Sequence, residues 1–228
     1  MDDKTGSVVA SRVMEIALKL DAAVDLADLS RSAERDFDLW SQGYDAKIVP
    51  GIYLSPARLT VLVTKHVAQF AGPILDLACG TGLMGEELRA LGFTDIIGVD
   101  LSGRMLERAA AKAVYSRLVK ADMHGTLPLN PGSFAAVVCM GAFYEGIADV
   151  QALAHVLPLI RPGGHLICDI EMVAWEAGGF GAALRVLAAE GLLDLLHAMP
   201  GRFFAPGHTG ADDDGVSPQG VFVVARVT

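Results

Sequence analysis

The sequence predicts a doubly wound α/β fold: a mostly parallel seven-stranded sheet with an antiparallel last strand, and N-terminal helices that form a lid. From residue 73 onward, short apolar stretches rich in β-branched residues alternate with helical ones, as in parallel βαβ units. A glycine-rich loop follows the first apolar stretch, where open α/β sheets bind ligands. The terminal run GVFVVARVT follows no clear helix, which predicts a closing antiparallel hairpin.

Two helices are predicted at the N-terminus. Apolar residues recur at helical spacing between Val9 and Leu20, with Ser7 as a candidate N-cap. A second amphipathic pattern runs from Leu26 to Trp40. These helices are the ones expected to close over the ligand.

A loop and a third helix lead into the sheet. Glycine and proline break up the stretch 41–56, and Pro56 then begins a helix that runs to about residue 70. We expect residues 1–55 to form a helical lid and part of the substrate site, and residues 56–228 to form the cofactor-binding domain.

The alternating pattern predicts the remaining elements in order. Strands are expected at 73–78, 95–100, 115–122, 134–141 and 164–171, and helices at 84–91, 103–113, 149–159 and 180–189. The stretch LLDLLHAM fits a strand or a helix equally well.

Composition narrows the classes of partner. The chain of 228 residues carries 18 Lys and Arg against 27 Asp and Glu, a net charge of −9, and its basic residues are scattered, which argues against nucleic acid. No apolar run reaches the ~18 residues of a membrane helix. The acidic N-terminus lacks the basic start of a secretory signal. We expect a cytoplasmic protein that binds neither nucleic acid nor membrane, and the oligomeric state is left open.

The cysteines predict neither a disulfide nor a metal site. Cys79, Cys139 and Cys168 are far apart in the sequence and lie in or beside predicted strands. We therefore expect buried, reduced thiols and no bound metal. The acidic run Asp212–Asp214 is expected to be a solvated loop.

The stretch ILDLACGTGLMGEEL carries two overlapping signatures. Gly80, Gly82 and Gly85 spell the G-x-G-x-x-G of dinucleotide binding, whereas the D-x-A-x-G-x-G that begins at Asp76 is associated with S-adenosylmethionine. Under either interpretation Gly80 and Gly82, which lack a Cβ, let the backbone turn sharply and approach a ligand. The loop alone leaves both cofactors open, as well as a tight turn without a ligand.

Asp100 and Asp122 extend this pattern to the next two strands. Asp100 ends the second strand, where a carboxylate can accept hydrogen bonds from both hydroxyls of a ribose. It could instead be a helix N-cap, but Ser102 is at least as good a cap. Asp122 ends the third strand and suits the exocyclic amine of an adenine, which the nicotinamide signature does not require. S-adenosylmethionine is therefore favoured over NAD.

The motifs LDLACGTG, GVDLS, ADM, FAAVVCMGAF and LIRPGGHLI occur in this order. Over about residues 36–171 the chain thereby resembles the class I (Rossmann-like) S-adenosylmethionine-dependent methyltransferases. With DLWSQGYDAKI, SPARL and MGAFYEGI added, it resembles most the methyltransferase-like 27 (Williams–Beuren-region) relatives. The terminal strand matches the antiparallel seventh strand of the family.

The resemblance implies a set of cofactor-binding residues. Those at the methionine end are Tyr44, Arg58, Asp76, Ala78, Cys79, Gly80, Thr81 and Gly82. Those at the ribose and adenine are Asp100, Leu101, Met105, Asp122 and Met123, and those near the sulfonium are Met140 and Gly141. Tyr44 could equally pack the N-terminal helices onto the sheet, and Arg58 could lie on a solvated helix face.

The implied function is methyl transfer to a small molecule. The protein then supplies mainly proximity and orientation, with Tyr144 and Glu145 as candidate proton acceptors after the fourth strand. Other candidates are His124, Glu171 and His208. The sequence leaves two alternatives: an S-adenosylmethionine-binding protein with a non-methylating role, as a sensor or in a cyclisation, and a nicotinamide-dependent oxidoreductase.

Overall fold

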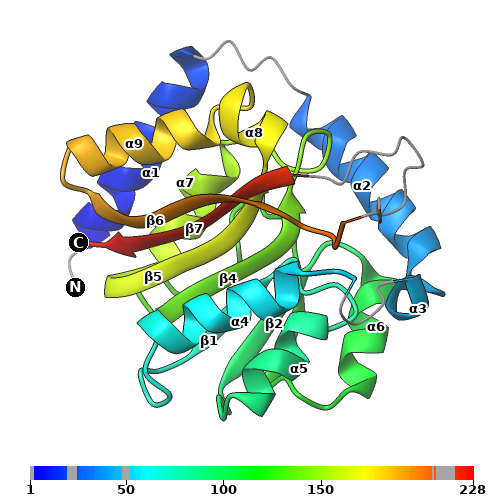
Figure 1. Ribbon diagram of the computed structural model, residues 1–228. Helices are drawn as coiled ribbons and strands as arrows, with labels where there is room; N and C mark the ends of the chain where they lie inside the picture. The colour runs from blue at the N-terminus through cyan, green and yellow to red at the C-terminus, as the bar shows by residue number, and fades with distance from the viewer. Residues whose placement is uncertain (1–2, 20–24, 48–51, 207, 209–218) are drawn as a thin grey trace.

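The computed structural model describes residues 3–19, 25–47, 52–206, 208 and 219–228. Within these ranges one seven-stranded sheet has the strand order β3-β2-β1-β4-β5-β7-β6 (Figure 1). Strand β7 is antiparallel to both of its neighbours, and the other pairs are parallel. The strands are β1 (Ile74–Leu77), β2 (Ile96–Asp100), β3 (Arg117–Lys120), β4 (Phe134–Phe143), β5 (Ile160–Glu171), β6 (Leu193–Arg202) and β7 (Gln219–Val227).

Helices cover both faces of this sheet. One core contains α4 and α5 against one face, and the other contains α1, α7 and α9 against the opposite face (Figure 1). The helices are α1 (Asp3–Lys19), α2 (Leu26–Trp40), α3 (Tyr44–Lys47), α4 (Ser55–His66), α5 (Leu83–Ala90), α6 (Gly103–Ala111), α7 (Ala152–Val156), η1 (Leu157–Leu159), α8 (Met172–Glu176) and α9 (Phe180–Ala189). The predicted doubly wound fold is therefore confirmed.

Several predicted boundaries differ from the structure. Ser7 lies inside α1 and does not cap it, and α4 ends at His66 rather than near residue 70. The third strand is shorter than predicted and ends at Lys120, so Asp122 lies in the following loop. The ambiguous stretch LLDLLHAM belongs to β6, whose pairing with β7 decides between strand and helix. The acidic run Asp212–Asp214 lies outside the described residues.

The N-terminal helices divide between two roles. Helix α1 buries Val9, Val13 and Ile16 in the core beside α7 and α9. Helix α2 instead lies against α6 on the right of Figure 1, near the ends of β2 and β3. Among the described N-terminal helices, α2 and not α1 therefore lies beside the ends of these strands.

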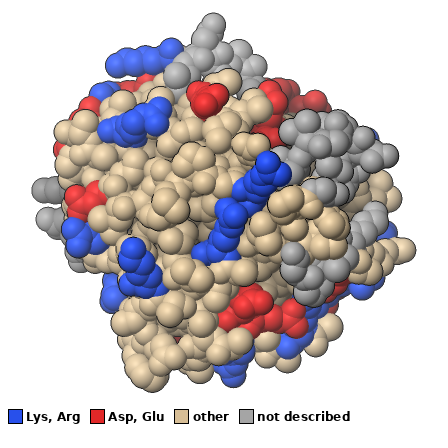
Figure 2. All heavy atoms as spheres, in the orientation of Figure 1, with Lys and Arg blue, Asp and Glu red and all other residues tan. Residues whose placement is uncertain are grey.

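The remaining expectations concern the cysteines, a membrane-spanning helix and the distribution of basic residues. Cys79, Cys139 and Cys168 are buried free thiols, as predicted. In the described ranges no helix is long and apolar enough to cross a membrane. On the face drawn in Figure 2, Lys and Arg form separate groups with wide uncharged areas between them.

Candidate functional site

The glycine loop turns sharply at the end of β1. Ala78, Gly80 and Gly82 have φ angles of 55°, 53° and 93°, in the left-handed region that favours glycine. Helix α5 begins immediately afterwards, at Leu83. A non-glycine residue in this conformation costs free energy, and such residues concentrate at binding sites.

Asp100 closes β2 and ties this loop to the next one. Its Oδ2 accepts a hydrogen bond from the Gly80 N–H and its Oδ1 accepts one from the Ser102 N–H, both at 2.8 Å. Burial raises the pKa of Asp100 above its usual value, and these N–H groups oppose that rise. Ser102 Oγ caps α6 by accepting from the Met105 N–H, as predicted. Each Asp100 oxygen retains a lone pair for a further donor.

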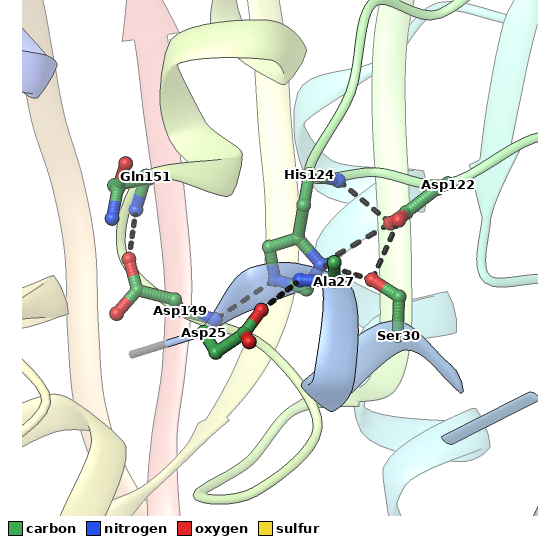
Figure 3. A network of polar contacts seen from close by, with 7 residues as sticks. All are labelled: Asp25, Ala27, Ser30, Asp122, His124, Asp149 and Gln151. Atoms are coloured by element: carbon green, nitrogen blue, oxygen red, sulfur yellow. Dashed lines mark hydrogen bonds and ion pairs between the residues drawn. The ribbon is translucent and has the colours of Figure 1, made fainter. Parts of the chain in front are cut away.

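Asp122 lies at the centre of a polar network (Figure 3). Its Oδ2 accepts from the Ser30 hydroxyl at 2.6 Å, and its Oδ1 accepts from the His124 N–H at 2.9 Å. His124 Nε2 accepts from the Asp149 N–H at 3.0 Å. The imidazole proton is therefore assigned to Nδ1, which lies 3.2 Å from Asp122 Oδ1. His124 and Asp122 thus fix each other's orientation, and the role of His124 as a proton acceptor stays a prediction.

Helix α2 is fixed over this edge of the sheet by residues four apart, which share one helix face. Ser30 bonds to Asp122, Glu34 lies 2.6 Å from Lys120 Nζ, and Asp38 Oδ1 accepts from the Ser102 hydroxyl. The apolar side chains Ala33 and Phe37 line the cavity underneath.

Helix α3 continues this cover over the glycine loop. Asp45 accepts a hydrogen bond from the Thr81 hydroxyl and lies 3.1 Å from Lys112 Nζ. Lys112 also pairs with Glu86 of α5 at 2.6 Å. Sequence reasoning assigned no role to Ser30, Asp38 or Asp45, although their polar spacing on amphipathic helices was a usable signal.

The cavity brings together ten of the predicted cofactor residues: Tyr44, Ala78, Gly80, Asp100, Leu101, Met105, Asp122, Met123, Met140 and Gly141. Its wall also contains His124, which the sequence offered as a candidate proton acceptor, and residues without a predicted role: Ser30, Ala33, Phe37, Leu77, Val99, Ala121, Ala142 and Ile147. Five predicted residues are absent from the wall: Arg58, Asp76, Cys79, Thr81 and Gly82.

The contacts of Asp76 and Gly85 with Tyr115 explain why these two residues occur in the motif. The Tyr115 hydroxyl donates to Asp76 Oδ2 at 2.7 Å, and a Cβ on Gly85 would lie 2.3 Å from that hydroxyl oxygen. Burial raises the pKa of Asp76 to about 7, although Tyr115 opposes the rise. The third glycine of the apparent dinucleotide fingerprint therefore accommodates a tyrosine side chain.

Arg58, Tyr144 and Glu145 also lie away from the cavity wall. The Arg58 guanidinium lies 5.0 Å from the centroid of the Phe222 ring. Glu145 is exposed, and its N–H donates to Glu171 Oε2 at 2.8 Å. Tyr144 packs against the Phe203 ring, with centroids 5.3 Å apart. The roles predicted for these three residues stay predictions.

The carboxyl end of β5 holds a carboxylate that sequence reasoning missed. Asp169 is fully buried, and its Oδ1 accepts from the Gly141 N–H at 2.7 Å. This bond supports the irregular segment of β4 between Cys139 and Phe143, which lines the cavity. An acidic residue inside the apolar run LICDI was the available signal.

The cavity fits the parts of S-adenosylmethionine. Asp122 and the apolar Met105 and Leu101 suit an adenine, and Asp100 suits a ribose. The left-handed backbone at Gly80 leaves open space beside the loop, because a Cβ there would meet nothing within 4 Å. Tyr44, the first residue of α3, also lines this cavity.

Known proteins with similar sequences are methyltransferases. A methyltransferase-domain family matches residues 74–164. Methyltransferase-like protein 27 of Homo sapiens is 36% identical over 160 residues, which are 68% of this chain and 63% of that protein. The chain thus matches slightly less than two thirds of that relative. The ubiquinone biosynthesis O-methyltransferase of Thiobacillus denitrificans is 30% identical over 180 residues, 76% of this chain and 73% of that protein.

A solved structure supports the fold. The [4+2]-cyclase SpnF matches with a TM-score of 0.65 and 18% identity, over 87% of this chain and 96% of its own. Identity this low shows the shared fold alone. Together with the glycine loop, the strand order and the similar sequences, it leads to one assignment: the chain belongs to the class I (Rossmann-like) S-adenosylmethionine-dependent methyltransferase family.

Proposed function

We propose that the protein transfers a methyl group from S-adenosylmethionine to a small-molecule acceptor. The observation that carries this proposal is the cavity between the carboxyl ends of the strands and the cover made by α2 and α3. Such a covered site suits a metabolite better than a nucleic acid or a protein chain. The similar ubiquinone biosynthesis O-methyltransferase also takes, by its name, a small molecule in a biosynthetic pathway.

The chain's contribution would be to bind, orient and exclude water. The bound cofactor supplies an electrophilic methyl group on a positively charged sulfur. Asp122 and Asp100 would hold the adenosine, and the backbone from Ala78 to Gly80 would hold the methionine portion. We propose that α2 and α3 act as the lid within the predicted segment 1–55, while α1 belongs to the core.

A titration followed by a turnover assay tests this function. S-adenosylmethionine and S-adenosylhomocysteine should bind and raise the melting temperature, because ligands that bind only the folded state stabilise it. NAD and NADP should have much smaller effects. Methyl transfer from labelled cofactor to a panel of phenols, amines and thiols then identifies the acceptor class. A larger melting shift with NAD would contradict the cofactor, and binding without transfer to any acceptor would favour the non-methylating alternative.

The net charge and the distribution of basic residues support the proposed class of partner. The net charge of −9 and the separated basic groups in Figure 2 favour a small-molecule partner over nucleic acid. The cytoplasm is the proposed location, which tagging and imaging of the full-length protein would test.

A further inference from the structure

The predicted ligand contacts follow the order of the strands. Asp122 lies after β3, Asp100 ends β2, Gly80 follows β1 and Gly141 lies in β4. Because the sheet order is β3-β2-β1-β4-β5, the next position beyond Gly141 is the carboxyl end of β5. Asp169 occupies that position. The line of predicted contacts that begins at Asp122 therefore leads past Gly141 to Asp169.

Asp169 has one carboxylate oxygen with no partner. Its Oδ1 accepts from the Gly141 N–H, whereas its Oδ2 is buried and accepts no hydrogen bond from any described residue. The buried Ser55 hydroxyl lies close enough to Asp169 to oppose the rise that burial causes in the pKa of that carboxyl, but its geometry gives no hydrogen bond to Oδ2. A buried polar group without a partner costs free energy, so such groups are rare and call for an explanation. An acceptor that donates a hydrogen bond to Oδ2 would supply it.

Three tyrosine side chains lie in the neighbourhood of this carboxylate. A Cβ on Gly141 would lie 3.0 Å from the Tyr53 hydroxyl, so Tyr53 stands directly beside the cavity wall. Burial and the charge of Asp169 raise the pKa values of Tyr44, Tyr53 and Tyr144, which places Asp169 within electrostatic reach of all three side chains.

The walls of the same region are aromatic. The Phe203 ring packs on Tyr144 with centroids 5.3 Å apart, and the Phe204 ring packs on Tyr53 at 5.0 Å. Flat aromatic surfaces of this kind pack well against another ring. The region thus combines a hydrogen-bond acceptor with surfaces suited to an aromatic molecule.

We propose that Asp169 Oδ2 receives the hydroxyl of an aromatic acceptor, in a subsite walled by Tyr44, Tyr53 and Tyr144. This inference rests on the proposed function and names its acceptor class, phenols and catechols. Asp169 would then have two tasks: Oδ1 holds Gly141 in place, and Oδ2 aligns the acceptor oxygen with the methyl group.

The proton balance is consistent with this assignment. When a hydroxyl oxygen forms its bond to the methyl carbon, the carbon–sulfur bond breaks with its electron pair left on sulfur, and the hydroxyl proton must leave. Asp169 can take this proton, because burial raises its pKa to about 6, closer to neutrality than that of an ordinary carboxylate.

Entry of the acceptor requires the Tyr53 segment to move. Residues 52–54 pair with residues 203–205 through two backbone hydrogen bonds, from Leu54 N–H to the Phe203 oxygen and from Ala205 N–H to the Ile52 oxygen. This pairing places Tyr53 over Gly141 in the structure. Opening of this segment would release these two hydrogen bonds and the packing of the Tyr53 ring against Phe204, while the pairs within the sheet would stay intact.

Calorimetric titration of catechol into the protein saturated with S-adenosylhomocysteine tests the subsite. Wild type should bind catechol, and Asp169→Asn should weaken this binding by at least about tenfold, as expected for the loss of a charged hydrogen bond. The amide oxygen of the variant can still accept from Gly141, so its affinity for S-adenosylhomocysteine should stay close to wild type. Asp194→Asn, at an exposed ion pair with Arg226, is the matched control and should change neither affinity.

Three further measurements complete the test. Tyr53→Phe, which keeps the ring, should weaken catechol by a smaller factor, and it provides a second variant if Asp169→Asn melts below the assay temperature. Wild-type catechol affinity should fall between pH 8 and pH 5, because a protonated Asp169 no longer offers a charged oxygen. Benzoate should bind less well than catechol, since its charge would meet that of Asp169.

The overturning outcomes are separate from those of the proposed function. The subsite is contradicted if wild type does not bind catechol, if Asp169→Asn binds it as tightly as wild type, or if benzoate binds more tightly. Tighter binding of benzylamine than of catechol would replace the hydroxyl class with amines. Failure to bind S-adenosylhomocysteine in wild type would instead contradict the proposed function.

Discussion

Each end of the site contains a fully buried carboxylate, and the two carboxylates differ in their hydrogen-bond partners. Asp76, under the glycine loop, accepts a hydrogen bond from Tyr115 and is stabilised by the Gly85 N–H. Asp169, at the carboxyl end of β5, has one oxygen bonded to Gly141 and one with no partner in the described structure. Burial raises both pKa values, to about 7 and about 6 respectively.

This difference separates a carboxylate that builds a site from one that can receive a ligand. Asp76 has donors within the fold, so its part is to hold the glycine loop. The unpaired oxygen of Asp169 has no such use within the fold. A raised pKa alone would not distinguish the two residues, but the count of their hydrogen bonds does.

The largest effect at the cofactor end is expected from Asp100→Ala. Two charged hydrogen bonds to the ribose, at about 1.5–3 kcal/mol each, would be lost. The affinity for S-adenosylhomocysteine should fall by at least about tenfold in calorimetric titration. The exposed Asp95→Ala is the control and should bind normally. Normal binding by Asp100→Ala would limit this carboxylate to its contacts with Gly80 and Ser102.

Tyr115→Phe is expected to destabilise the fold rather than abolish binding. The raised pKa means that the folded state holds the Asp76 proton more tightly than the unfolded chain does. The stability from this group is therefore present in acid and is lost as the pH rises to about 7. Without the Tyr115 hydroxyl the pKa rises further, and the free energy of unfolding at pH 8 should fall by about 1–3 kcal/mol.

Urea unfolding at pH 5 and pH 8 measures this prediction. The loss should be larger at pH 8, where Asp76 is charged, than at pH 5. The neighbouring Ser116→Ala should show no such pH dependence, since its hydroxyl bonds to the exposed Asp95. An equal loss at both pH values would mean that Tyr115 stabilises the fold through packing alone. Asp76 would then lack the stabilising hydrogen bond that distinguishes it from Asp169.

The smallest effects on the affinity for S-adenosylhomocysteine are expected from substitutions in α2, which covers the cavity. Ser30→Ala removes the part-buried hydrogen bond to Asp122 and should weaken S-adenosylhomocysteine by about fivefold, since such a bond contributes about 1 kcal/mol. Glu34→Ala, one turn further along the same face, removes an exposed ion pair and should change the affinity by less than about twofold. Tighter binding by Ser30→Ala would show that its hydroxyl competes with the adenine for Asp122.

The sequence predicted the fold and many of the residues that line the cavity, because their signals are local. Gly80, Asp100 and Asp122 each lie at or shortly after the end of a strand, and strand order then brings them together. The tyrosine-lined end is assembled from Tyr53, Gly141, Asp169 and Phe203, which come from four distant parts of the chain. No spacing rule connects them, so their proximity emerges only from packing. The local patterns also misplaced Ser7 as an N-cap and left β6 undecided, because tertiary pairing decides such cases.

The spacing of Ser30, Glu34 and Asp38 on one face of α2 has a kinetic consequence. With α2 as the proposed lid, a bound molecule beneath it would leave after the contacts to β3, its loop and the start of α6 are released together. Simultaneous release is rarer than the loss of any one contact, so spent cofactor would have a long residence time. Exchange of cofactor, more than the chemical step, would then set the pace of repeated turnover.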